Sequence, residues 1–163
     1  MHFRHYLFTM ILLCPAVFTF AQPEQDSSLR RCPVFITDTV SANNFFIEGL
    51  PCNVKLFRVK GKLTLEMKQK DQYFTLFFHD KKLKTQSYSI ARGSNGKKEV
   101  EARYSFRSGS QVSYVDVSRG SMEVTLDEEK KLWHLKVNGM LANMVERSVT
   151  WYRVKAEFFL KAE

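Results

Sequence analysis

The side chains that could carry chemistry in this sequence are few and lie far apart. His79 and His134 each stand alone within a stretch that predicts a β-strand, and no HExxH spacing is present. The chain has no CxxC pair, no phosphate-cradling loop and no GxSxG nucleophile elbow, and Gly93-Ser94-Asn95-Gly96 has the wrong spacing for one. We therefore expect no catalytic residues, no cofactor and no metal. An active site would need ionisable side chains that folding brings together around His79 or His134.

The three adjacent acids Asp127-Glu128-Glu129 are a further candidate, in this case for binding a cation. Calcium sites need several spaced oxygen ligands in a defined loop, and here two lysines follow the acids directly. The segment therefore predicts a solvated turn between two strands.

The first residues of the chain predict export. Arg4 precedes an almost wholly apolar run over residues 7–20, and small residues occupy the positions before a cleavage site between Ala21 and Gln22. The run is shorter than the roughly 20 apolar residues that a membrane-spanning helix needs. We therefore expect a signal peptide over residues 1–21, no membrane span after its removal, and a periplasmic or extracellular protein. A lipid anchor at Cys14 is disfavoured because Leu13 stands where a small residue is needed.

Cys32 and Cys52 are the cysteines that remain after such cleavage. An even number of cysteines in an oxidising compartment favours a disulfide. A disulfide between them would close a loop of about 20 residues and stabilise the fold by about 3 kcal/mol in the chain-entropy model. Two free buried thiols are the alternative, because spacing alone does not show that two positions meet.

The net charge of +8 at pH 7 limits the partners. A basic exported protein is attracted to an anionic lipid surface, an acidic glycan or an acidic envelope protein. Nucleic acid is not an expected partner outside the cytoplasm. The alternative is that the lysines line solvent-facing strands and protect sheet edges against aggregation.

Alternation of apolar and polar residues recurs along the chain and predicts β-strands. It is clearest at residues 62–68, 121–126 and 133–137, where one face of each strand is apolar. Residues 22–31 are polar and predict a flexible leader. Turn signals separate further strand candidates at residues 34–40, 44–48, 54–59, 73–79, 87–91, 100–106, 111–117 and 150–160. The pattern predicts one all-β domain over residues 32–163, an antiparallel β-sandwich of about ten strands, with a β-barrel as the alternative.

The alternation does not decide the structure of two segments. Residues 73–78 are apolar on both faces, which predicts a central strand. Asn138-Gly139 could form a hairpin turn, or the glycine could lie within a strand that continues towards residue 146. The many aromatic residues predict a filled core, although some could line a lipid cavity or form a sugar-stacking patch.

In the C-terminal half, a strand at residues 120–126 is followed by a charged turn, a strand at residues 135–141 and a closing strand at residues 154–159. This pattern resembles that of small exported proteins and lipoproteins of Bacteroidota. The chain departs from these families at Ala156-Glu157, where they tend to place a glycine. The resemblance implies an envelope-associated β domain and brings no site residues with it.

These observations predict a non-catalytic binding or interaction module in the cell envelope. The alternative is a carrier that holds a hydrophobic small molecule inside a β-barrel, which would need a closed apolar cavity.

The leader and the cysteines generate one prediction. The exported protein should begin at Gln22, and its mass should rise by the mass of two hydrogen atoms on reduction, because reduction opens a Cys32–Cys52 bridge. Intact-mass spectrometry with and without reductant measures both. Free thiols in the unreduced protein would contradict the bridge.

Overall fold

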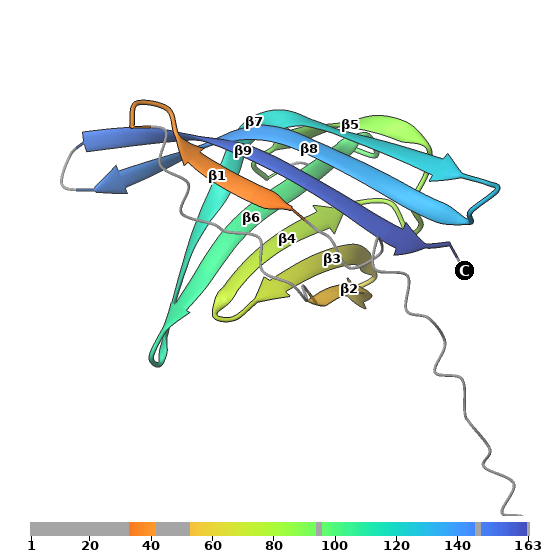
Figure 1. Ribbon diagram of the computed structural model, residues 1–163, viewed down its shortest axis with the longest axis horizontal. Coiled ribbons are helices and arrows are strands. Elements are labelled where there is room, and N and C mark those ends of the chain that lie inside the picture. Colours follow the sequence, from red (N-terminus) through yellow and green to blue (C-terminus); the bar gives the residue numbers. More distant parts are fainter. Residues whose placement is uncertain (1–32, 42–52, 94–95, 146–147, 163) are drawn as a thin grey trace, which may run out of the picture.

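A single β-sheet makes up the described part of the chain (Figure 1). The computed structural model describes residues 33–41, 53–93, 96–145 and 148–162. These residues contain no helix, and so none long and apolar enough to cross a lipid bilayer. The strands are β1 (Val34–Asp38), β2 (Asn53–Val59), β3 (Lys62–Gln69), β4 (Gln72–Phe78), β5 (Gln86–Ala91), β6 (Glu99–Ser108), β7 (Gln111–Asp127), β8 (Leu132–Val145) and β9 (Ser148–Lys161).

The strand order is β1-β9-β8-β7-β5-β6-β4-β3-β2, with an additional pairing of β7 with β6. Every pair is antiparallel except the short pairing of β5 with β6. The all-β prediction is therefore confirmed. The sheet is not closed into a barrel, since β1 and β2 are its two edges and do not pair with each other.

The sheet folds over so that its two halves face each other (Figure 1). In this view β1, β9, β8, β5 and the second part of β7 form an upper layer, β4, β3 and β2 form a lower layer, and β6 and the first part of β7 run between them. Phe74 of β4 lies 6.1 Å from Phe158 of β9, measured between ring centroids, although these strands are not neighbours in the sheet. The arrangement is therefore compatible with the predicted sandwich, built from one continuous sheet.

The core lies between the two halves, where one face of each strand is apolar. Leu63, Leu65 and Met67 of β3 are buried, as their alternation predicted. The central-strand prediction for residues 73–78 is also correct, because β4 lies between β3 and β6. Further buried side chains come from both halves, among them Ile36, Phe74, Leu76, Phe78, Tyr88, Ile90, Val100, Met122, Val124, Leu135, Val137, Val154 and Phe158.

Strand β7 differs most from the prediction. Residues 111–117 and 121–126 were expected as two strands separated at Gly120, but they form one strand of 17 residues. Its first part pairs with β6 and its second part with β5, and a bulge lies between Val117 and Arg119. Gly120 therefore marks a bend within a strand.

Gly120 and Gly139 face each other across β7 and β8 at this bend. A Cβ atom on Gly120, whose φ is 157°, would collide with the carbonyl oxygen of Asn138. A Cβ atom on Gly139 would lie 2.6 Å from Cγ1 of Val117. The second of the two alternatives for Asn138-Gly139 is thus correct, since the glycine lies inside β8.

Some predictions fall outside the described residues. These are the signal peptide with its cleavage site at Ala21 and Gln22, the leader, the strand candidate at residues 44–48, and the cysteines Cys32 and Cys52.

Replacing Gly120 with alanine should lower the free energy of unfolding by about 3 kcal/mol, because the methyl group collides with backbone atoms of β8 and the positive φ is strained. Urea denaturation measures the loss. Gly109→Ala is the matched control: its φ is 59° and nothing lies within 4 Å of the added carbon. That control should cost only about 1 kcal/mol, and equal losses for the two variants would show that the collision is unimportant.

Candidate binding groove

The two histidines singled out in the sequence have separate partners on separate strands. Nε2 of His79, just after β4, lies 4.0 Å from Oε1 of Glu101 on β6. Nε2 of His134 on β8 lies 2.5 Å from Oε1 of Glu157 on β9, and its ring stacks on Phe159 at 4.5 Å between centroids. Each histidine thus forms a cross-strand pair with one glutamate, and the fold does not bring the two histidines into one cluster.

The acidic segment 127–129 forms the hairpin tip between β7 and β8. Oδ1 of Asp127 accepts a hydrogen bond of 3.0 Å from the backbone N–H of Lys130, and Oδ2 lies 3.5 Å from its ammonium group. The backbone N–H of Lys130 is the main reason that the pKa of Asp127 lies below its ordinary value. The carboxyl therefore caps the turn, as expected for a solvated tip. Within the described ranges, no three His, Cys, Asp or Glu side chains are grouped so that they could hold a metal ion.

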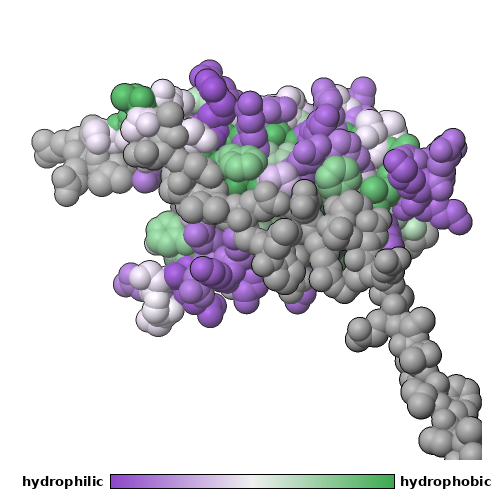
Figure 2. Space-filling model, viewed as in Figure 1, coloured by the Kyte–Doolittle hydropathy of each residue, from purple (hydrophilic) through white to green (hydrophobic). Residues whose placement is uncertain are grey.

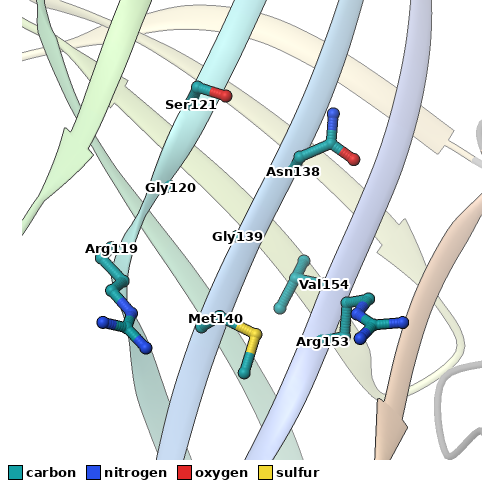
Figure 3. A pocket seen from close by; sticks show the side chains of 8 residues that line it. All are labelled: Arg119, Gly120, Ser121, Asn138, Gly139, Met140, Arg153 and Val154. Atoms are coloured by element: carbon teal, nitrogen blue, oxygen red, sulfur yellow. The ribbon is translucent and has the colours of Figure 1, made fainter. Parts of the chain in front are cut away.

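One hollow in the described part of the chain lies on the outer face of β7, β8 and β9 (Figure 3). It has a volume of about 540 Å³ and is open to solvent. We call it the arginine groove. It is lined by Arg119, Gly120, Ser121, Asn138, Gly139, Met140, Arg153 and Val154.

The register of the strands explains how the groove forms. Arg119, Met140 and Arg153 lie opposite one another on three adjacent strands, with Met140 in the middle. Next to this row, Gly120, Gly139 and Val154 form a second row in which Val154 turns its side chain to the core. No residue of this second row turns a side chain to the outer face, so its backbone forms the floor of the hollow beside the two arginines (Figure 3).

The groove is positively charged. Among the described residues, neither Arg119 nor Arg153 forms an ion pair, whereas Arg103 and Arg92 both pair with Asp116 at 2.7 and 3.7 Å. The guanidinium of Arg119 lies 5.6 Å from the ring centroid of Trp151, which restricts where it can point. Two exposed guanidinium groups without an acidic partner in the described part of the chain therefore flank one hollow.

A second, smaller hollow of about 230 Å³ adjoins the groove at Asn138. Lys136 and Lys155 contribute cations to its lining, and Phe35 of β1 contributes an exposed ring. The carboxylate of Glu157 also lines this hollow, and the same carboxylate contacts His134. Figure 2 shows hydrophilic side chains over this layer of strands with apolar patches between them. The two hollows together form a basic track across β7, β8, β9 and β1.

This arrangement can bind an anion and hold it in a defined orientation. A guanidinium fork matches the oxygens of a carboxylate, sulfate or phosphate, and charge-assisted hydrogen bonds of this kind are stronger than neutral ones. The side chains of Ser121 and Asn138 add neutral donors and acceptors at the rim. The volume of the groove lies within the range of small-molecule sites.

Sequence reasoning did not find the arginine groove. Its residues come from three strands, and no local motif contains them. The available signal was the pair of glycines within strands, which indicates close backbone approach but not what lies beside it.

Comparisons of the chain with protein-family models, with curated proteins and with solved structures find no match. The resemblance to exported proteins of Bacteroidota therefore stays a prediction from the sequence.

The capped turn predicts a specific pH dependence. Because the pKa of Asp127 is lowered in the folded chain, its ionised carboxyl stabilises the fold above the ordinary value of 3.8, and this stabilisation is lost as pH falls through the folded-state pKa. Asp127→Asn should therefore lower the midpoint of thermal unfolding near neutral pH, and the difference from the unmodified protein should disappear in acid. Thermal unfolding followed by circular dichroism across this pH range measures it. Glu128→Gln removes a charge from the same turn without removing the cap; an equal effect from that variant would contradict the prediction.

Proposed function

We propose that this protein is an exported, non-catalytic binding module of the cell envelope that holds an acidic glycan chain in the arginine groove. The observation that carries the proposal is the pair of guanidinium groups, Arg119 and Arg153, that flank one open hollow without an acidic partner among the described residues. A structural role alone does not require two like charges to stand on either side of an unfilled surface.

The shape of the track favours a chain over a flat surface as the ligand. The two hollows adjoin, so that a linear polyanion could lie across β7, β8, β9 and β1 with its charged groups near Arg119, Arg153 and Lys155. A lipid bilayer presents a plane, and its charged head groups would reach a hollow less readily than the protruding side chains around it. Acidic sugars also present hydroxyl groups that Ser121 and Asn138 can hydrogen-bond.

The packing of the inner face supports a binding module over a carrier of a hydrophobic molecule. The Phe74 and Phe158 rings stack at 6.1 Å across the two halves, and the Phe78 and Tyr88 rings meet edge to face at 5.6 Å. All four side chains are at most 1% exposed. Aromatic side chains thus occupy the space in which a carrier would hold its ligand.

The double variant Arg119→Gln/Arg153→Gln should lower the affinity for polygalacturonic acid by more than about tenfold, because each lost guanidinium removes a charge-assisted hydrogen bond of about 1.5 kcal/mol or more. Isothermal titration calorimetry at low ionic strength measures the affinity, which should fall as salt is added. Neutral dextran should not bind, since it offers no anion.

Lys97→Gln/Lys98→Gln is the matched control, because it removes the same net charge from an exposed position outside the track. It should change the affinity by less than about twofold, as expected for a general charge effect. Equal losses in the two double variants would overturn the groove as the site. Binding to phosphatidylglycerol vesicles that depends on Arg119 and Arg153, without binding to the glycan, would instead identify a lipid head group as the ligand.

A further inference from the structure

Among the described residues, the edge strand β2 pairs with β3 alone, which leaves a row of its backbone groups without partners in that part of the chain. The two-residue turn Lys60-Gly61 joins β2 to β3 with positive φ at both positions. In such a hairpin Val59 and Lys62 exchange backbone hydrogen bonds, and the bonded pairs then recur at every second residue. The backbone N–H and C=O groups of Val54, Leu56 and Arg58 therefore point away from the sheet.

Exposed apolar side chains accompany this free edge. Leu56 is 44% exposed, Phe57 38% and Val59 43%, and all three lie on this strand. Proteins commonly protect an exposed edge by shortening it, covering it, interrupting it with a bulge or placing charged side chains on it, and of these β2 has the cations Lys55 and Arg58, which repel a like-charged strand. β2 pairs with β3 over its whole length of 7 residues in unbroken register, so a further strand could extend the sheet there.

The charges around β2 decide between possible occupants. Lys55, Arg58 and Lys60 lie on or directly beside the strand, and a guanidinium nitrogen of Arg58 donates to the carbonyl oxygen of Lys81 at 3.1 Å. Lys62, Lys81 and Lys82 are exposed nearby, and Glu66 lies opposite Lys55 in the register. A second copy of this chain would bring an identical row of cations alongside, which is unfavourable. An acidic segment would meet opposite charges.

We infer that β2 is a docking edge for an extended, acidic segment of a partner protein, which adds to the sheet as a tenth strand beside β2. Its backbone exchanges hydrogen bonds with Val54, Leu56 and Arg58, as in β-strand addition.

The two faces of β2 define the partner's sequence pattern. Val54 and Leu56 lie opposite Met67 and Leu65, which point into the core, so the partner's residues on that face are apolar. Lys55 and Phe57 lie opposite Glu66 and Thr64 on the outer face, where the partner presents carboxylates to the lysines around the edge. The partner segment therefore alternates apolar and acidic residues.

A proline at position 56 tests the edge directly. The N–H of Leu56 points away from β3, so Leu56→Pro removes a donor of the free edge and keeps every hydrogen bond between β2 and β3. The probe is a fluorescently labelled peptide of alternating Glu and Val, about ten residues long so that it spans the strand. Fluorescence anisotropy should show binding to the unmodified protein and an affinity at least about tenfold lower for Leu56→Pro.

Two further double variants distinguish this inference from its alternatives. Lys55→Glu/Lys60→Glu should weaken binding of the Glu-Val peptide and allow binding of a matched Lys-Val peptide, because the charge at the edge is reversed. Arg119→Gln/Arg153→Gln should leave peptide binding unchanged, which separates this inference from the proposed glycan site. Circular dichroism and the unfolding midpoint establish that each variant is folded.

The inference is overturned if the Glu-Val peptide does not bind, or if the folded Leu56→Pro variant binds it as tightly as the unmodified protein. It is also overturned if light scattering shows a dimer that Leu56→Pro dissociates, since the occupant would then be a second copy of this chain.

Discussion

The close approach of Gly120 on β7 to Gly139 on β8 is the contact on which the rest of the sheet depends. At this point β7 has passed its bulge, has left β6 and has joined β5. A bend of this kind needs backbones that come nearer than side chains permit, and a Cβ atom at either glycine would collide with neighbouring atoms. Because β7 changes partners here, the sheet can fold over, and Phe74 can meet Phe158 across the core.

The same contact forms the floor of the arginine groove. The positions without side chains let the two backbones pack closely, and this backbone lies at the bottom of the hollow between Arg119 and Arg153. A side chain at Gly139 would point to the core, towards Val117, and not into the hollow. The bend and the binding surface thus share one stretch of backbone, and a change at either glycine that shifts β7 against β8 would move the arginines as well.

Local pattern accounts for the parts of this structure that could be predicted. Strand β3 buries Leu63, Leu65 and Met67 because alternation along one strand is enough to define a core face. Gly120 was misinterpreted because glycine signals both a turn and a bend within a strand, and the choice depends on a partner strand that local sequence does not identify. Arg119 and Arg153 were missed for a related reason: they become neighbours only through the register of β7, β8 and β9.

The effect of the chain's net charge depends on where its charged side chains lie. Asp116 of β7 pairs with two arginines, Arg103 of β6 and Arg92 just after β5. At the arginine groove and along the edge of β2, no ion pair with Arg119, Arg153 or Lys55 occurs among the described residues. Long-range attraction would draw an anion to either place, so charge by itself cannot make them selective.

Selectivity must come from short-range geometry: the spacing of two guanidinium groups at the groove, and a row of backbone donors and acceptors at the edge. A flexible acidic sugar chain lacks the regular peptide groups that the edge requires. An extended peptide whose backbone is paired at the edge would have to dissociate before it could lie in the groove.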